Sequence, residues 1–366
     1  MEHPENDDLY KGLKVNKGVA DVPTVNPYLK KRIQRKEYTP AEFVEGILKG
    51  NITILSQAVT LVESSKYEHQ QVAQEIIEKC LPHAGKSVRI GITGVPGAGK
   101  STSIDAFGMH LIGEGRKLAV LAIDPSSERS KGSILGDKTR MEALSREKNA
   151  FIRPSPSAGS LGGVARKTRE TIVLCEAAGF DTVFVETVGV GQSETAVHSI
   201  VDFFLLIQLA GTGDELQGIK RGIMEMADGI IINKADGDNL EKAKLAAAQF
   251  RNALHLFPAP ESGWFPKVLT YSGYYNLGIK EIWDMVGEYM EFTQKNGYFN
   301  YKRNEQAKYW MYESINDTLR ETFYHNPAVE SMLNLTEQQV LNNEISSFVA
   351  AKRMMDLFLE NLSASK

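Results

Sequence analysis

Two short stretches of the sequence carry residue types and spacings suited to nucleotide chemistry. The first, residues 94–102, reads G-V-P-G-A-G-K-S-T and fits the pattern G-x-x-x-x-G-K-[ST]. In this pattern the glycines let successive backbone N–H groups point at phosphate oxygens, and the lysine reaches the β and γ phosphates. The predicted phosphate contacts are therefore Gly94, Gly97, Ala98, Gly99, Lys100, Ser101 and Thr102.

The second stretch, residues 233–236, reads N-K-A-D and suits the guanine base. A carboxylate such as Asp236 can accept hydrogen bonds from both N1–H and the exocyclic N2–H₂ of guanine, whereas adenine does not present these two donors together. We therefore predict that Asn233, Lys234 and Asp236 frame guanine, and that the ligand is GTP or GDP. Ser272, followed by a glycine, either adds a backbone contact to the base or forms a plain turn.

Acidic residues follow two of the apolar runs. In a P-loop enzyme, Mg²⁺ bridges the β and γ phosphates and is held by the loop Ser/Thr and by an acid at a strand end. Ser101, Asp124 and Glu186 meet this requirement, although Asp124 before a proline can also start a turn and Glu186 can also cap a helix. The upstream phosphate loop favours the metal-binding interpretation for both acids.

The sequence after Glu186 departs from that of common GTPases, which have D-x-x-G here and a water-orienting glutamine next. This chain has E-T-V-G over 186–189, followed by Val190. The longer glutamate arm is suited to a metal contact through water, and the valine predicts slow intrinsic hydrolysis. Gln192 is a nearby candidate for positioning the attacking water.

Apolar runs and helical patterns alternate along the middle of the chain. Several runs are continuously apolar, as expected for parallel strands that are covered on both faces. We therefore predict an α/β fold of the P-loop NTPase type, with a doubly wound, mainly parallel sheet and its ligand at the carboxyl ends of the strands. The predicted strands cover residues 88–93, 118–123, 150–153, 182–185, 203–209, 229–232 and 268–271.

Helical patterns flank this region on both sides. A polar arm and a helical hairpin, interrupted at Gly50, precede it, and helices follow from about residue 281. The predicted division is therefore 1–86 for the N-terminal arm and extension, 87–280 for the nucleotide domain and 281–366 for a helical C-terminal region. A heptad seam near the C-terminus suits either an intramolecular core or a homodimer contact, and its terminal position favours the dimer. The seam consists of Leu341, Ile345, Phe348, Lys352, Met355, Leu359 and Leu362.

Composition argues against several classes of protein. The 366 residues carry a formal net charge of −4, so no large basic field is available for nucleic acid. The two cysteines are far apart, which fits a reducing compartment. No apolar run reaches the ~18 residues of a membrane span, and the acidic start of the chain does not resemble a leader peptide. We expect a soluble, cytoplasmic protein that binds neither nucleic acid nor membrane.

Together with G-T-G-D-E-L-Q-G-I-K over 211–220, these motifs resemble the MeaB/ArgK family, the G-protein chaperones of adenosylcobalamin-dependent methylmalonyl-CoA mutase. The resemblance covers nearly the whole chain. It implies a homodimeric GTPase that gates cofactor loading and protects this mutase or a related acyl-CoA mutase, with GTP hydrolysis as a timing step.

The resemblance also assigns roles to individual residues. It implies that Asp124, Asp137 and Glu186 are the metal-associated acids. It places Asp214 and Lys220 on a loop that moves when the partner binds and brings a cation to the nucleotide, so that Lys100, Glu186, Asp214 and Lys220 form the catalytic group. From the sequence alone, Lys220 can equally be a solvated surface lysine.

Three other functions compete with this hypothesis. A metal-delivery GTPase of the nickel type would need clusters of Cys and His ligands, and the sequence has no C-x-x-C. The sequence lacks the H-R-D and D-F-G motifs of protein kinases, which argues against a transport-system kinase or ATPase. A nucleotide-dependent binding module that does not hydrolyse GTP at a useful rate can be separated from a GTPase only by a turnover assay.

Overall fold

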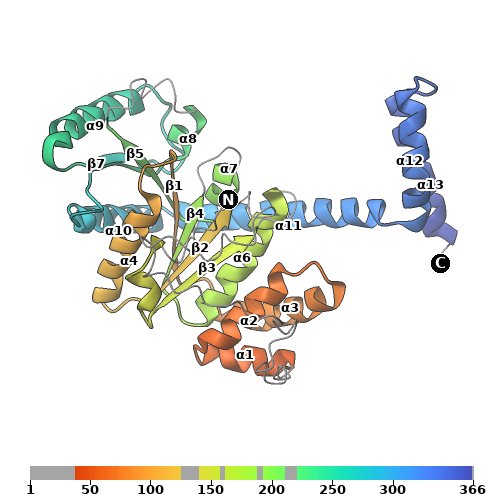
Figure 1. Ribbon diagram of the computed structural model, residues 1–366, viewed down its shortest axis with the longest axis horizontal. Coiled ribbons are helices and arrows are strands. Elements are labelled where there is room, and N and C mark those ends of the chain that lie inside the picture. Colours follow the sequence, from red (N-terminus) through yellow and green to blue (C-terminus); the bar gives the residue numbers. More distant parts are fainter. Residues whose placement is uncertain (1–37, 125–139, 157–160, 188–192, 211–220, 365–366) are drawn as a thin grey trace, which may run out of the picture. The chain divides into compact units, whose positions relative to one another are not determined.

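The computed structural model describes residues 38–124, 140–156, 161–187, 193–210 and 221–364. A seven-stranded sheet forms its centre, with every strand pair parallel (Figure 1). The strand order is β3-β2-β4-β1-β5-β6-β7, and all seven predicted strands are present. The strands are β1 (Val88–Gly94), β2 (Leu118–Asp124), β3 (Ala150–Pro156), β4 (Thr182–Thr187), β5 (Phe203–Leu209), β6 (Gly229–Asn233) and β7 (Lys267–Thr270).

Helices cover both faces of this sheet, which confirms the predicted doubly wound arrangement. On one face, α4 (Lys100–Gly113) and α10 (Ile279–Lys295) share a core with alternate residues of the central strands. On the other face, α8 (Arg221–Met226) and α9 (Leu240–Leu254) pack on β5, β6 and β7. Strands β4 and β6 are buried along their whole length, which explains why their sequences are continuously apolar.

The strand order reverses at β1. From this central strand the chain crosses to β2 on one side, whereas β5, β6 and β7 follow on the other side. Ligands of open α/β sheets bind at such a switch point, outside the carboxyl ends of the strands. Because the phosphate loop follows β1 directly, the topology places it at this position.

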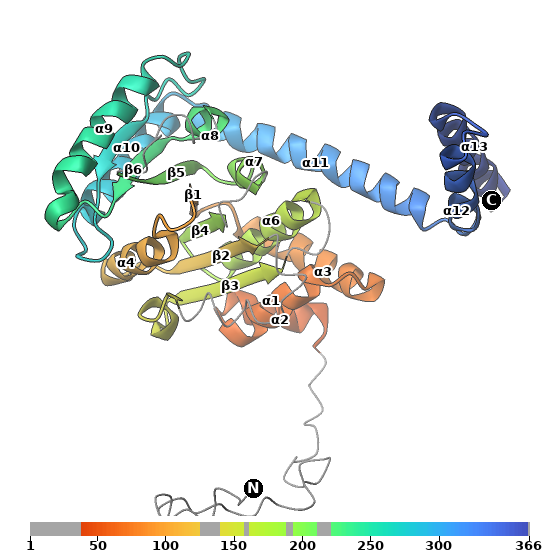
Figure 2. The ribbon, with the colours of Figure 1, turned by 45° about the horizontal axis from the view of Figure 1, so that its top comes forward.

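The N-terminal extension consists of three helices where the sequence predicted a hairpin. They are α1 (Pro40–Leu48), α2 (Ile52–Glu63) and α3 (Tyr67–Cys80). Gly50 separates the first two with a φ of +72°, as predicted, but a second break at Ser64 ends α2. The helices pack beside α6 (Leu161–Ala177) and the β3 edge of the sheet (Figures 1 and 2). Arg153 of β3 forms an ion pair with Glu63 of α2 and helps to fix this contact.

Helix α10 belongs to the packing of the sheet although its sequence reads as part of the C-terminal helical region. Ile282, Met285, Val286 and Tyr289 lie in the same core as β1 and β5. The first turns of the next helix, α11 (Tyr298–Tyr324), are hydrogen-bonded to the segments that precede β1 and β5. Arg303 Nη2 donates to Asp202 Oδ2 at 2.7 Å, and the Asp202 side chain is 2% exposed. The predicted division at residue 281 stays a prediction, since helical character alone does not mark the end of the nucleotide domain.

Two truncations should therefore differ in stability. A chain that ends at residue 315 keeps the Arg303–Asp202 ion pair, whereas a chain that ends at 297 loses this ion pair together with the other hydrogen bonds from α11 to residues 198–202. Loss of one partner of a buried ion pair costs about 3–5 kcal/mol, which corresponds to a fall of about 10 °C in the midpoint of thermal unfolding. Calorimetry of both truncations with GDP bound measures this difference. Equal midpoints would show that the α11 contact does not stabilise the nucleotide domain.

The C-terminal helices α12 (Pro327–Leu341) and α13 (Ser347–Ala364) pack on each other. Their small core contains Val329, Met354 and Phe358. Most of the heptad seam lies outside this core, because Leu341, Phe348, Met355, Leu359 and Leu362 are 43–87% exposed. The seam residues therefore do not form the intramolecular core that one interpretation predicted, and a contact with a second copy remains a proposal.

Candidate nucleotide-binding site

The phosphate loop joins β1 to α4, and its glycines are required by close contacts. Gly94 has a φ of +156°, and a Cβ atom there would lie 2.2 Å from the Ile207 carbonyl oxygen. Gly99 has a φ of +86°, and its Cβ would lie 2.6 Å from Asn233 Nδ2. Any side chain at these positions would clash, so the loop can approach β5 and the N-K-A-D segment only with glycine.

Lys100 begins α4 and turns back over the loop. Its Nζ donates to the carbonyl oxygens of Gly94 at 2.8 Å and Val95 at 3.3 Å. Burial lowers the pKa of Lys100, and the carboxylates of Glu186 and Glu194 act in the opposite direction. A cation held in a partly desolvated loop interacts strongly with any anion that enters it, which suits the predicted contact with phosphate.

Ser101 and Glu186 lie together at the carboxyl end of the sheet. Ser101 Oγ donates to Glu186 Oε1 at 3.2 Å, and Glu186 is 8% exposed. Hydroxyl and carboxylate oxygens are the ligands that Mg²⁺ prefers, so this pair fits the predicted metal. Asp124 ends the neighbouring strand β2, two residues beyond Ala122, which lies opposite Glu186 in the sheet register. The described residues contain no group of three or more His, Cys, Asp or Glu side chains arranged around one metal position.

Asn233 connects the two nucleotide motifs. Its Nδ2 donates to the Ala98 carbonyl oxygen of the phosphate loop at 2.7 Å. Its Oδ1 accepts from the backbone N–H of Lys234 at 2.7 Å and of Gly273 at 3.2 Å. The side chain is 4% exposed, so Asn233 holds three loops in register. These contacts join the two motifs, and the part of Asn233 in framing guanine stays a prediction.

Ser272 has a role that the sequence did not reveal. Its Oγ donates to Asp236 Oδ2, and its backbone pairs with Leu277 in a turn. Ser272 is fully buried, so this hydrogen bond is shielded from water. The turn interpretation is thus supported, and the Ser272 hydroxyl orients the carboxylate that the sequence predicts to recognise guanine. A backbone contact from this turn to the base stays a prediction.

Lys234 adopts a left-handed conformation with a φ of +58°. This conformation is uncommon for a residue other than glycine and persists only where neighbours enforce it. Asn239 Nδ2 donates to the Lys234 carbonyl oxygen at 2.7 Å, which holds the backbone in place. Such local strain is concentrated at binding sites, in agreement with the predicted guanine loop.

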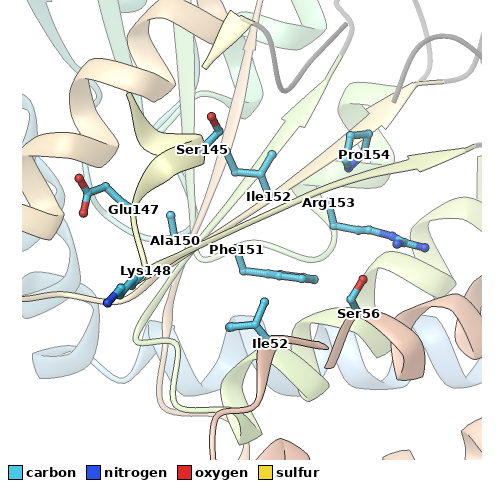
Figure 3. Close-up of a pocket in the computed structure, with 10 residues that line it drawn as sticks. All are labelled: Ile52, Ser56, Ser145, Glu147, Lys148, Ala150, Phe151, Ile152, Arg153 and Pro154. Atoms are coloured by element: carbon cyan, nitrogen blue, oxygen red, sulfur yellow. The ribbon is translucent and has the colours of Figure 1, made fainter. Parts of the chain in front are cut away.

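A cavity of about 660 Å³ adjoins these loops. It extends from Thr102 and Asp105 of α4 to Gly273 and Tyr274 in the turn after β7. Its volume lies in the range of small-molecule sites. A second cavity of about 340 Å³ lies at the opposite edge of the sheet, where the Phe151 side chain lies between β3 and Ile52 of α2 (Figure 3). None of the predicted nucleotide residues lines this second cavity.

Comparison with known proteins identifies the family of this chain. The sequence model of the family described as "Methylmalonyl Co-A mutase-associated GTPase MeaB" matches residues 55–328. The chain belongs to the MeaB family. The match begins in α2 and ends in α12, so it includes the whole nucleotide site.

Relatives of this MeaB-family chain include proteins that are named as GTPases. A putative GTPase of Caulobacter vibrioides is 49% identical over 85% of this chain and 95% of its own length. GTPase ArgK of Escherichia coli is 44% identical over 87% of this chain and 97% of its own. The mouse protein named methylmalonic aciduria type A homolog, mitochondrial, is 44% identical over 86% of this chain and 78% of its own.

A solved structure supports the fold. The crystal structure described as a LAO/AO transport system kinase superimposes with a TM-score of 0.69 and 38% identity, over 88% of this chain and 99% of that chain. This confirms the predicted P-loop NTPase fold. The family model and the names of the relatives confirm that the MeaB-family chain is a GTPase.

Some predicted site residues lie outside the described part of the chain. These are Asp137, Val190, Gln192, Asp214, Lys220 and the side chain of Asp124. Their roles stay predictions. The described residues bring together the phosphate loop, Glu186, Asn233, Asp236 and Ser272, which the sequence places up to about 180 positions apart.

Proposed function

We propose that this MeaB-family GTPase is a chaperone that gates adenosylcobalamin loading and protects methylmalonyl-CoA mutase or a close acyl-CoA mutase. The family description and the name of the mouse relative support this proposal. The observation that carries the guanine-nucleotide part is the Asn233 side chain, which bonds the base-recognition loop to the phosphate loop. One nucleotide can therefore contact both loops.

The proposed contacts follow the geometry of the loops. Lys100 brings its ammonium to the β and γ phosphates, and backbone N–H groups of residues 97–102 point at the remaining oxygens. Asp236, oriented by Ser272, accepts from the guanine edge. We propose that Ser101 and Glu186, with Asp124 and Asp137, hold Mg²⁺. A metal ion held by these residues would supply positive charge that offsets the negative charge of the β and γ phosphates.

Hydrolysis is proposed to be slow without the partner and to depend on the loop that contains Asp214 and Lys220. The protein is proposed to act as a homodimer through the exposed seam of α13 and the end of α12. In the described part of the chain, no helix is both long and apolar enough to cross a membrane. A cytoplasmic location stays a prediction.

Co-purification tests the chaperone proposal. The full chain is loaded with GDP or with a non-hydrolysable GTP analogue and mixed with purified methylmalonyl-CoA mutase. We expect a complex whose yield changes with the nucleotide, because the proposed gating requires the two nucleotide states to differ in affinity for the mutase. A CoA-dependent enzyme that does not use cobalamin serves as the control. Recovery equal to that control with both nucleotides would contradict the proposal.

A further inference from the structure

Two exposed tyrosines lie in the turn that follows β7, and none of the roles above uses them. Tyr274 is 81% exposed and Tyr275 is 60% exposed. Their rings pack edge to face, with centroids 5.0 Å apart. An exposed aromatic residue is common and indicates no function by itself. The case for a role therefore depends on where the turn places these two rings.

The turn is held in one conformation by its backbone. Ser272 and Leu277 exchange two hydrogen bonds between their N–H and carbonyl groups, both at 3.0 Å. Asn276 and Gly278 are left-handed, with φ of +56° and +82°. Asparagine and glycine adopt this conformation more readily than other residues. Tyr274 therefore stands at the tip of a turn whose two ends are bonded to each other.

The Ser272 hydroxyl connects this turn to the carboxylate that the sequence predicts to recognise guanine. It donates to Asp236 Oδ2 and accepts from the Tyr275 N–H at 3.4 Å. Ser272 is fully buried, so water does not compete for these bonds. Tyr274 follows Ser272 by two residues, and two residues span at most about 7 Å. A base whose edge meets Asp236 therefore lies within reach of the Tyr274 side chain.

The cavity of about 660 Å³ distinguishes the two tyrosines. Of these two described residues, Tyr274 lines the cavity and Tyr275 does not. Thr102, a predicted phosphate contact, lines the same cavity. One cavity therefore extends from the phosphate end of the predicted site to Tyr274.

Two of the charged side chains that line this cavity are already bonded. Asp105 Oδ1 accepts from the Leu144 N–H at 2.8 Å. Lys280 Nζ forms an ion pair with Asp284 Oδ2 at 2.6 Å. Tyr274 adds a flat aromatic surface to the same wall, and such a surface suits a purine better than a phosphate.

The contacts proposed above assign partners to the edge of guanine and to the phosphates, but not to the faces of the ring. Aromatic side chains bind nucleic acid bases by stacking on these faces. Stacking does not read the hydrogen-bonding edge of a base, so it adds affinity with little preference among purines. An aromatic side chain beside Asp236 would therefore complement that carboxylate.

We propose that Tyr274 stacks on the ring of the bound guanine and supplies affinity for the base, whereas Asp236 supplies the preference for guanine. The inference rests on the proposed nucleotide site and adds a residue that touches the ligand. Ser272 links the two contributions, because its hydroxyl bonds both to Asp236 and to the turn that carries Tyr274.

Nucleotide affinities test the stacking. The Tyr274→Ala variant should bind GDP and inosine diphosphate each about 10-fold more weakly than the wild type, so that the ratio of the two dissociation constants is kept. Tyr274→Phe keeps the ring and should bind both within about 2-fold of the wild type. Tyr67→Ala, which removes a tyrosine that is 72% exposed on α3, is the matched control. Wild-type affinity of Tyr274→Ala for GDP would overturn the proposal.

Inorganic pyrophosphate is a probe without a base. Because it has no ring to stack on, it should bind the wild type and Tyr274→Ala equally. If Tyr274→Ala weakened pyrophosphate and GDP by the same factor, the substitution would act on the phosphate loop, and the stacking would be wrong.

NMR of the bound nucleotide tests the contact directly. A stacked aromatic ring shifts the guanine H8 resonance upfield, and GDP labelled with carbon-13 at C8 reports this shift. We expect the upfield shift in the wild type and in Tyr274→Phe, and its loss in Tyr274→Ala. An H8 resonance that is the same in the wild type and Tyr274→Ala would contradict the stacking.

The Asp236→Asn variant separates this inference from the proposed site. If Asp236→Asn keeps the wild-type preference for GDP, the proposed base site is wrong and the stacking falls with it. If Asp236→Asn changes the base preference while Tyr274→Ala binds GDP as the wild type does, the base site stands and the stacking alone is removed.

Discussion

The Asp236→Asn variant is expected to prefer xanthosine diphosphate to GDP. In the proposed site the Asp236 carboxylate accepts from two donors on the guanine edge, and an amide at this position would instead offer a donor to the C2 carbonyl of xanthine. Ser272 Oγ donates to the side chain at 236, so it can hold the amide oxygen and turn the amide nitrogen toward the base. Sites built on paired hydrogen bonds discriminate by about 10⁴-fold when those bonds are left unmade.

Dissociation constants of the wild type and of Asp236→Asn for GDP and XDP measure this change in base preference. Asp238→Asn is the matched control, because Asp238 is an exposed acid two positions away. The control should keep the wild-type preference for GDP. If the two affinities of Asp236→Asn do not cross over, Asp236 does not recognise the base.

The sheet was predictable because the sequence pattern that specifies each strand is local. Several strands are continuous apolar runs, such as Ile230 to Ile232 in β6, and burial on both faces requires that pattern. The phosphate loop was predictable for the same reason, since Gly94 and Gly99 are needed for contacts that no other residue allows.

The missed features depend on contacts between distant segments. The hydrogen bond from Ser272 to Asp236 joins residues 36 positions apart, and neither residue type indicates from the sequence that the bond forms. Glu194 is 3% exposed in the helix Ser193–His198, and this burial follows only from the packing of the fold. Likewise, the apolar residues of α10 are compatible with any helical bundle, and only the structure shows that they belong to the sheet.

The second large effect is expected in the rate of GTP hydrolysis when the proposed partner, an acyl-CoA mutase, is added. Val190 stands where a water-orienting glutamine is common, so the isolated chain should hydrolyse GTP slowly. An added cation at the transition state accelerates other GTPases by about 10³- to 10⁵-fold. If the mutase brings Lys220 to the nucleotide, we expect stimulation of at least about 10-fold, and the Lys220→Ala variant should lose most of it while keeping its basal rate.

Lys234 supplies the matched control for this variant, because it is an exposed lysine that belongs to the predicted base loop. Lys234→Ala is expected to weaken nucleotide binding and to keep the stimulation once the protein is saturated with GTP. Equal stimulation of wild type and Lys220→Ala would remove the role proposed for Lys220.

Single-turnover GTP hydrolysis by the wild-type chain, with and without an adenosylcobalamin-dependent acyl-CoA mutase, tests the chaperone function most directly. If the chain is the chaperone of such a mutase, the rate constant rises at least about 10-fold when the mutase is added. A rate constant that methylmalonyl-CoA mutase and its close relatives all leave unchanged would contradict the partner and the function proposed here.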